Sequence, residues 1–207
     1  MMAQRLVASC RRQKRPLSDC KASLIAFELD DGSAELARDA VANALRATDV
    51  SLRDARSLAN HWVRTGDYLF EAFNLPPADY VIGNPPYVRL EDIPEEVVGL
   101  YRTSYPTMMG RADLYIEFYE AALRQLKPSG VCTFICADRW MLNQYGANLR
   151  ELIMSSFGVD TIIEMQNADA THDDVSAYPA VTVIRRGPQR KTGEQARILG
   201  GHLKTSH

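Results

Sequence analysis

A four-residue motif, Asn84-Pro85-Pro86-Tyr87, combines residue types that could hold a flat molecule bearing an amino group. The Asn84 side-chain carbonyl can accept a hydrogen bond from such an amine. The prolines fix φ, and Pro86 favours an extended conformation at Pro85, so the Pro85 carbonyl is held in one direction. Tyr87 supplies a ring that can stack on a base. The alternative is a proline-rich turn closed by a core tyrosine, and the tetrapeptide alone does not decide between the two.

Two acidic residues also follow predicted strands. Glu28 comes after a strand predicted over residues 23–27, and Asp67 comes after a strand predicted near residues 61–64. In nucleotide-binding sheets, an acidic residue after the second strand typically accepts hydrogen bonds from ribose hydroxyls, which fits Glu28. Asp67 could accept from an adenine amino group or cap a short turn. Each acid alone would indicate a cap or turn, but their order ahead of Asn84 favours a binding site.

The elements that must position these residues alternate between strand and helix, which predicts an α/β fold with a mostly parallel sheet. The turn at Asp30 predicts a helix cap, and a helix with an apolar stripe follows it at Leu36, Ala37, Ala40, Val41, Ala44 and Leu45. A long polar connection covers residues 89–111, and a strong helix follows Asp113. Further strands are predicted over residues 80–83, 131–136, 161–165 and 180–184, with a helix over residues 149–157.

Composition limits the class of protein. The chain has 207 residues, 46% of them hydrophobic and 24% charged, which is typical of one globular domain. No apolar run approaches the roughly 20 residues that span a membrane. The net charge is −2 and the pI about 6.1, so the chain lacks the basic character of many DNA-binding proteins. Either it does not hold DNA by itself, or the DNA-holding surface lies in a part not present here.

The cysteines and the N-terminus bear on the compartment. The four cysteines form no Cys-x-x-Cys pair, and Cys132 and Cys136 alternate with Phe134 as small hydrophobic residues on one face of a predicted strand. We expect no zinc site, and a reducing cytoplasm fits best. The basic N-terminal stretch lacks the apolar core of a signal peptide; a cationic surface helix is expected there, with a transit peptide as the alternative.

These residues carry a family resemblance. The order of Glu28, Asp67 and the tetrapeptide resembles the Rossmann-like methyltransferases that use S-adenosylmethionine. Further segments are similar to the adenine-specific DNA methyltransferases of restriction–modification systems, including those fused to a nuclease: Val88-Arg89, Ala112-Asp113-Leu114-Tyr115, Leu126-Lys127-Pro128-Ser129-Gly130, Asp138-Arg139-Trp140 and Tyr145-Gly146. The resemblance covers residues 22–186. It implies a Rossmann-like α/β sheet, S-adenosylmethionine as the cofactor and double-stranded DNA as the substrate.

The sequence departs from the family at its beginning. The family starts with a strand and a glycine-rich loop that wraps the methionine part of the cofactor, but no glycine occurs here before Gly32. Residues 1–14 resemble the helix that would follow that loop. We therefore expect residues 1–186 to be an N-terminally truncated catalytic domain whose incomplete sheet leaves strand edges unpaired. Residues 187–207 are expected to be a linker or tail toward an absent target-recognition domain.

The resemblance also implies roles for individual residues. A target adenine is flipped out of the duplex, and Tyr87 would stack on the extruded ring. The Asn84 side-chain carbonyl and the Pro85 backbone carbonyl would accept the two hydrogens of the exocyclic amine, and Pro86 would keep this corner rigid. The implied cofactor-binding residues are Glu28, Asp67 and Asn84.

Three further residues could contact the base. Asp113 and Tyr115 could shape its pocket, and the alternative is a helix cap followed by a core aromatic. His172 falls near the place where relatives put a second aromatic residue, and the alternative is a solvated loop. The adjacent Asp173 and Asp174 point in different directions, so this cluster does not indicate a metal site.

Other functions remain open at this level. Methyltransferases that modify a protein glutamine or a base of ribosomal RNA can carry the same tetrapeptide. The long connection over residues 89–111 and the region around Trp140 favour the DNA class. A chain without the glycine-rich loop could also be a remnant without catalytic activity, or one half of a split methyltransferase.

Overall fold

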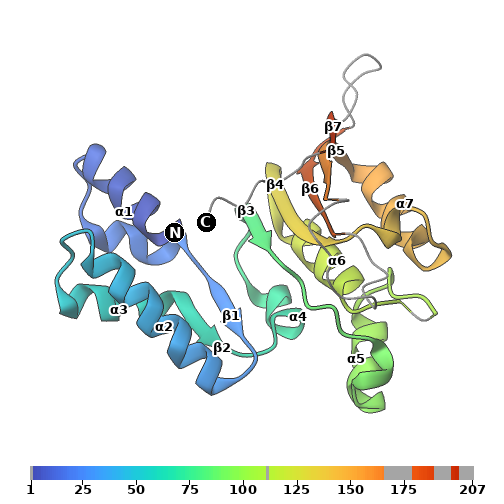
Figure 1. The fold of residues 1–207 in the computed structure, drawn as a ribbon, viewed down its shortest axis with the longest axis horizontal. Helices are drawn as coiled ribbons and strands as arrows, with labels where there is room; N and C mark the ends of the chain where they lie inside the picture. Colours follow the sequence, from blue (N-terminus) through green and yellow to red (C-terminus); the bar gives the residue numbers. More distant parts are fainter. Residues whose placement is uncertain (1, 111, 166–178, 189–196, 201–207) are drawn as a thin grey trace. The chain divides into compact units, whose positions relative to one another are not determined.

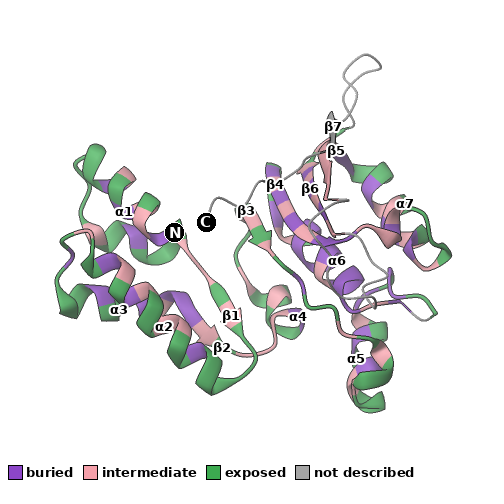
Figure 2. Cartoon of the chain, in the orientation of Figure 1, coloured by how far each residue is buried: buried purple, intermediate pink, exposed green. Residues whose placement is uncertain are grey.

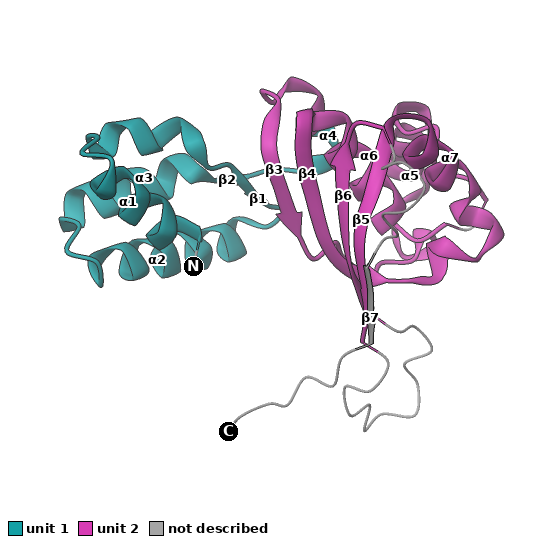
Figure 3. Cartoon of the chain, turned by 90° about the horizontal axis from the view of Figure 1, so that it is seen from above, with its two compact units in different colours: residues 1–71 teal, residues 72–207 magenta. Residues whose placement is uncertain are grey.

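The computed structural model describes residues 2–110, 112–165 and 179–188, together with the backbone of residues 197–200. The chain forms two compact units, residues 1–71 and residues 72–207, which Figure 3 shows in different colours. Each unit has its own sheet and its own apolar core. The domain that the sequence predicts over residues 1–186 spans both units.

The first unit combines helices with a short parallel sheet (Figure 1). Its helices are α1 (Met2–Arg12), the 3-10 helix η1 (Leu17–Ser23), α2 (Asp31–Arg46), α3 (Leu52–Trp62) and α4 (Tyr68–Glu71). The strands β1 (Ala26–Glu28) and β2 (Val63–Thr65) pair in parallel. The helix predicted at the basic N-terminus is present as α1.

Trp62 lies at the centre of the core of the first unit. Its ring is buried, and its Nε1 donates hydrogen bonds to the carbonyls of Cys20 and Lys21, both at 3.1 Å. These bonds satisfy the polar edge of a large apolar side chain, as burial of a tryptophan requires. They also fix the end of α3 against η1.

Helix α2 confirms the predicted cap but not the whole predicted stripe. The Asp30 carboxylate accepts a hydrogen bond from the Ser33 amide at 2.7 Å. Leu36, predicted on the apolar face, is 74% exposed, whereas Ala34 and Leu45 are buried. At 3.6 residues per turn, Leu36 lies about 200° around the helix from Ala34, on nearly the opposite side. The buried face of the helix includes Ala34 and Ala42 and leaves out Leu36, so it is rotated relative to the predicted stripe. Figure 2 colours the buried and exposed residues of α2.

The second unit contains a five-stranded mixed sheet with the order β3-β4-β6-β5-β7. The strands are β3 (Ala78–Gly83), β4 (Leu126–Ala137), β5 (Phe157–Glu164), β6 (Pro179–Arg186) and β7 (Arg197–Gly200). β3 and β4 are parallel, and β6 lies antiparallel between β4 and β5. The prediction that the last two predicted strands are neighbours is confirmed. The prediction of a mostly parallel sheet is wrong for this unit, because β6 is antiparallel to both of its neighbours. Antiparallel neighbours need no crossover helix, and the sequence predicts no helix between the last two strands.

Helix α6 (Tyr115–Gln125) and strand β4 form the core of the second unit. Tyr119 is buried with its ring centroid 5.0 Å from that of Phe134, and its hydroxyl shares a hydrogen bond with Thr182. Cys132 and Cys136 flank Phe134 on the same buried face of β4, which confirms the alternation predicted from the sequence. This core fixes the end of β3 that precedes the tetrapeptide, since Gly83 pairs with Phe134.

The connection predicted over residues 89–111 contains structure of its own. The 3-10 helix η3 (Leu90–Asp92) and helix α5 (Glu95–Ser104) lie within it. Val98 and Tyr101 are the buried residues of α5, whereas Leu100 between them is exposed, so the apolar residues of this helix do not mark one face clearly in the sequence. Helix α7 (Ala147–Ser156) follows β4 after two 3-10 turns, η4 (Arg139–Met141) and η5 (Gln144–Gly146).

Strand β7 lies inside the segment that the sequence predicts as a linker or tail, and it pairs in parallel with β5. That residues 187–207 lead toward a target-recognition domain stays a prediction. Among the described residues, no helix has both the length and the apolar character needed to cross a membrane.

Candidate active site

The tetrapeptide begins where β3 ends, against the ring of Phe134. A Cβ atom on Gly83 would lie 3.1 Å from that ring, so the glycine allows the close approach of strand and ring. Pro85 is buried, whereas Asn84 and Pro86 are exposed. The tetrapeptide is therefore anchored through one proline and presents its amide outward.

The acceptor groups of the tetrapeptide are not used inside the protein. No hydrogen bond from the described residues reaches the Asn84 side chain or the Pro85 carbonyl. The ring of Tyr87 is 55% exposed, so the alternative of a core tyrosine does not hold. The Asn84 side chain and Tyr87 are thus exposed at one corner, next to the buried Pro85.

The chain after the tetrapeptide is fixed by the residues ahead of α6. The Leu114 amide donates to the Val88 carbonyl at 3.1 Å, and Arg89 and Asp113 form an antiparallel bridge. Asp113 therefore adopts an extended backbone, and it is not the side-chain cap of α6 that the alternative reading proposed; the N-cap is Leu114, without a side-chain bond.

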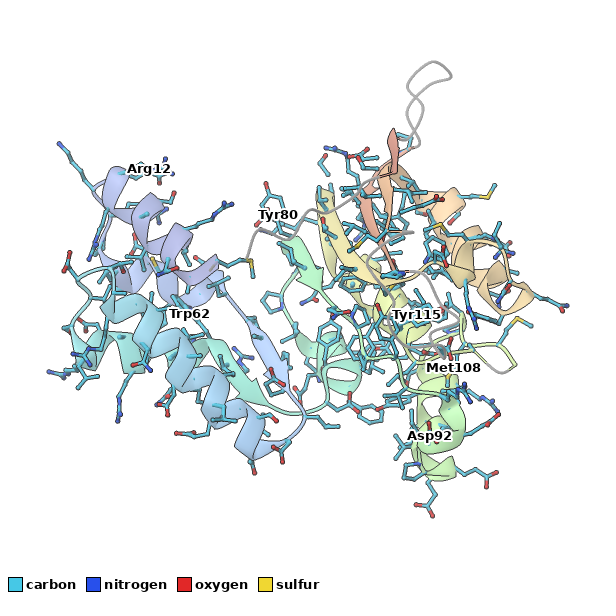
Figure 4. The ribbon with its side chains drawn as sticks, viewed as in Figure 1. Arg12, Trp62, Tyr80, Asp92, Met108 and Tyr115 are labelled. Carbon is cyan, nitrogen blue, oxygen red and sulfur yellow. The ribbon has the colours of Figure 1, made fainter. Side chains whose placement is uncertain are left out.

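The bridge brings Tyr87 beside Tyr115. The two ring centroids are 6.5 Å apart and the rings meet edge to face at 71°. Tyr115, which Figure 4 labels at the start of α6, is fully buried. Asp113 lies close by: burial raises the pKa of its carboxyl, and the positive charges of Arg139 and Arg89 oppose that rise. Tyr87, Asp113 and Tyr115 thus lie together, and their contact with a base stays a prediction.

Tyr145 adds a fourth residue to this group. Its hydroxyl lies 2.8 Å from that of Tyr115, and burial raises the pKa of both phenols. Both hydroxyls therefore keep their protons at neutral pH. Sequence reasoning recorded Tyr145 only as part of a family pattern, because a contact across thirty residues leaves no periodic signal.

The loop that carries Tyr145 folds tightly on itself. A Cβ atom on Gly146 would lie 2.0 Å from the Trp140 carbonyl oxygen, so no other residue fits there without a shift of the backbone. Arg150 Nη1 donates to the carbonyls of Trp140 and Asn143 at 2.6 and 2.9 Å. A glycine and an arginine thus hold the loop that places Tyr145.

Two neighbouring carboxyls on α6 differ in how they are satisfied. Glu120 accepts hydrogen bonds from the Thr107 amide and hydroxyl and forms an ion pair with Arg124. Glu117 is fully buried, and neither of its oxygens has a partner among the described residues. Burial therefore raises the pKa of Glu117 to about 8.

The first unit carries the two acidic residues predicted to hold a cofactor. β1 and β2 are parallel, Glu28 is in register with Thr65, and the Gly66 amide donates to the Glu28 carbonyl at 2.9 Å. The Glu28 side chain is exposed, and the Asp67 Oδ1 accepts from the Leu69 amide at 2.9 Å as a cap of α4. The structure brings these two acids to the same end of the β1–β2 sheet.

For two predicted site residues, the structure does not show the expected neighbours. Asn84 belongs to the second unit, so a cofactor site formed by Glu28, Asp67 and Asn84 together stays a prediction. His172, predicted as a second aromatic contact, lies outside the described residues.

The chain is similar in sequence to known methyltransferases. Residues 25–170 match the family described as Eco57I restriction-modification methylase. The chain is 41% identical over 187 residues to the Type II methyltransferase M.PaeR7I of Pseudomonas aeruginosa, covering 88% of this chain and 32% of the relative. It is 38% identical over 174 residues to M.XhoI of Xanthomonas vasicola, covering 84% and 32%. The chain thus spans about a third of the length of these relatives.

Solved structures support the fold. A nuclease-deletion mutant of the Type ISP restriction-modification enzyme LlaGI, solved with a DNA substrate mimic, matches 89% of this chain and 22% of its own length, with a TM-score of 0.59 at 15% identity. The M protein of the Type I restriction enzyme EcoKI matches 79% and 31%, with a TM-score of 0.52 at 19% identity. The predicted Rossmann-like α/β fold, with an incomplete sheet, is confirmed. The family match covers most of this chain, and the chain therefore belongs to the Eco57I restriction-modification methylase family.

Proposed function

We propose that this protein transfers a methyl group from S-adenosylmethionine to the exocyclic amino group of adenine in DNA, as part of a restriction–modification system. Membership of the family and the names of the curated relatives support the reaction class. The observation that carries the choice of an amine substrate is the corner at the end of β3. There the Asn84 amide oxygen and the Pro85 carbonyl accept no hydrogen bond from the residues that the structure describes, and Tyr87 beside them is exposed.

The reaction follows from the groups at this corner. An adenine inside a duplex must be flipped out, and stacking on Tyr87 is worth about 1–3 kcal/mol. The amino nitrogen is a poor nucleophile because its lone pair is delocalised into the ring. When Asn84 and Pro85 accept its two hydrogens, the nitrogen becomes more pyramidal and its lone pair is available for attack. Fixed acceptors also stabilise the positive charge that grows on the nitrogen.

The residues at the end of the β1–β2 sheet fit the polar part of S-adenosylmethionine. The cofactor supplies an electrophilic methyl group on a sulfonium. The exposed carboxylate of Glu28 can accept hydrogen bonds from ribose hydroxyls. Asp67 accepts the Leu69 amide in the cap of α4, and a carboxylate oxygen is also the type of acceptor that an adenine amino group requires.

Double-stranded DNA with a flipped adenine is the proposed partner, together with a recognition domain or subunit. The net charge of −2 supports a second source of DNA affinity, because phosphate neutralisation supplies most non-specific binding. The greater length of the curated relatives agrees with such a source.

The product of the reaction tests the proposal. Purified protein is incubated with labelled S-adenosylmethionine and unmethylated genomic DNA, and the digested DNA is analysed by mass spectrometry for N6-methyladenine and N4-methylcytosine. Parallel reactions contain ribosomal RNA or a release factor as the methyl acceptor. We expect N6-methyladenine in DNA alone, and far less of it with an Asn84→Ala variant.

Methylation of RNA or of a protein glutamine would replace the DNA assignment by one of its alternatives. Absence of transfer, together with no calorimetric binding of S-adenosylmethionine, would identify a remnant or one half of a split enzyme. Either result contradicts the proposal.

A further inference from the structure

We propose that Tyr145 is a positioning residue, which holds the ring of Tyr115 and through it the ring of Tyr87 in the orientation that stacks on a base. The inference rests on the proposed function and extends it to a residue that does not touch the substrate. It identifies the loop between β4 and α7 as the part of the protein that orients the base-stacking ring.

The exposed ring of Tyr87 requires support on one side. More than half of its surface is open, yet a stacking platform must keep its plane while a base arrives. Tyr115 provides the contact, because its buried ring meets Tyr87 edge to face. Such a geometry is favoured between aromatic rings, and it fixes the tilt of one ring relative to the other.

The position of Tyr115 depends in turn on its hydroxyl. A buried hydroxyl needs a hydrogen-bond partner, and Tyr145 supplies it at 2.8 Å. Burial raises the pKa of Tyr115 well above its usual range, so the hydroxyl stays protonated and the bond persists. The pair therefore prevents the Tyr115 ring from shifting along its own axis.

The loop gives Tyr145 a fixed position of its own. Arg150 donates hydrogen bonds to the carbonyls of Trp140 and Asn143, in the turn that leads to Tyr145. Gly146 closes directly on the Trp140 carbonyl, where any side chain would collide. The loop thus positions Tyr87 in two steps. The Tyr145 hydroxyl bonds that of Tyr115, and the Tyr115 ring contacts that of Tyr87.

A fluorescent nucleoside tests the inference. The 2′-deoxyriboside of 2-aminopurine lacks the 6-amino group, so its quenching by the chain reports stacking and not the bonds to Asn84 or Pro85. We expect a Tyr145→Phe variant, which keeps the ring and loses the hydroxyl, to bind the probe about two- to tenfold more weakly, as for one lost hydrogen bond. Thermal unfolding followed by near-UV circular dichroism shows that the variant is folded.

A double-mutant cycle separates positioning from general stability. If the two hydroxyls act as a pair, Tyr115→Phe, Tyr145→Phe and the double variant weaken binding to a similar extent. The matched control is Tyr80→Phe, which removes a hydroxyl from a tyrosine of β3 that is 73% exposed; it leaves the affinity unchanged.

The outcomes are distinct. Additive losses in the cycle, or a Tyr145→Phe affinity equal to that of the unmodified chain, overturn the role of Tyr145. If Tyr87→Ala quenches as well as the unmodified chain, or if the unmodified chain does not quench, the base-stacking site itself is contradicted and the proposed function fails with it. Loss of quenching in Tyr87→Ala with no change in Tyr145→Phe overturns the further inference alone.

Discussion

Asp67 and Asn84 both lie just beyond the end of a parallel strand, but the protein uses their side chains differently. Two residues after Asp67, the Leu69 amide donates to the Asp67 carboxylate. Two residues after Asn84 stands Pro86, which has no N–H to donate. The usual local partner of an Asn or Asp side chain is this amide, so the prolines keep the Asn84 oxygen free. The proline pair thus preserves an acceptor as well as stiffening the corner.

A third polar group extends the comparison into the core. Within the part of the chain that the structure describes, neither Glu117 nor the Asn84 side chain has a hydrogen-bond partner, but Glu117 is buried, whereas Asn84 is exposed. An exposed acceptor without an internal partner can bind a ligand, because water satisfies it until the ligand arrives. A buried one has no such substitute and costs free energy when charged. The same lack of partners therefore has opposite consequences at the two places.

The largest expected effect comes from removing the free acceptor. Asn84→Ala should lower kcat for DNA methylation about 100- to 1,000-fold, as for loss of one fixed polar group in an active site. The thermal midpoint should not change, because the side chain is exposed and makes no hydrogen bond with the residues that the structure describes. Steady-state kinetics and circular dichroism measure the two quantities. A kcat close to that of the unmodified protein would contradict the role of Asn84.

The buried carboxyl should give the next effect, on stability. Because the pKa of Glu117 is raised from 4.5 to about 8 in the folded state, the unfolded state binds fewer protons between these pH values. Stability therefore falls as pH rises from about 4.5 to about 8, by a few kcal/mol in total. Glu117→Gln should remove this pH dependence and stabilise the protein at pH 8.

Glu120→Gln is the matched control for Glu117→Gln. Glu120 is bonded to Thr107 and Arg124, so its substitution should destabilise the protein. Urea unfolding at pH 5 and pH 8 measures both variants. Equal pH dependence in Glu117→Gln and the unmodified protein would show that Glu117 does not titrate in this range.

Restoring a local donor sharpens the comparison directly. Pro86→Ala gives residue 86 an N–H that can bond the Asn84 oxygen, as Leu69 does for Asp67. We expect about tenfold slower methylation, because a local bond of about 1.4 kcal/mol must break before the substrate amine can bind. Pro86→Ala in the presence of Asn84→Ala should have no further effect on kcat. A full additive loss in that double variant would show that Pro86 acts through rigidity instead.

The smallest effect is expected at Asp67. Asp67→Ala removes the cap of α4 and should destabilise the protein by about 1 kcal/mol, which chemical denaturation measures. Asp67→Asn keeps an acceptor oxygen and should retain most of that stability. If Asp67→Asn lowers the affinity for S-adenosylmethionine while keeping the stability, the carboxylate has a ligand-binding role in addition to the cap.

Much of the local structure of this protein could be predicted from its sequence. Four features depend on residues within a few positions of one another. They are the Asp30 cap, the apolar alternation around Phe134, the strand before Asn84 and the amphipathic helix that begins at Tyr115. The sequence also shows that the two residues after Asn84 are prolines, which have no N–H to donate to its side chain. Such features follow from the period of a helix or strand and from hydrogen bonds across one turn.

Tertiary structure decided the features that depend on distant segments. Which surfaces pack together decides the antiparallel place of β6, the exposure of Leu36 and the burial of Glu117. The contact between Tyr115 and Tyr145, thirty residues apart, depends on a loop that closes at Gly146. Sequence periodicity reports which face of an element is apolar, but the partner that covers that face is selected by packing over the whole core.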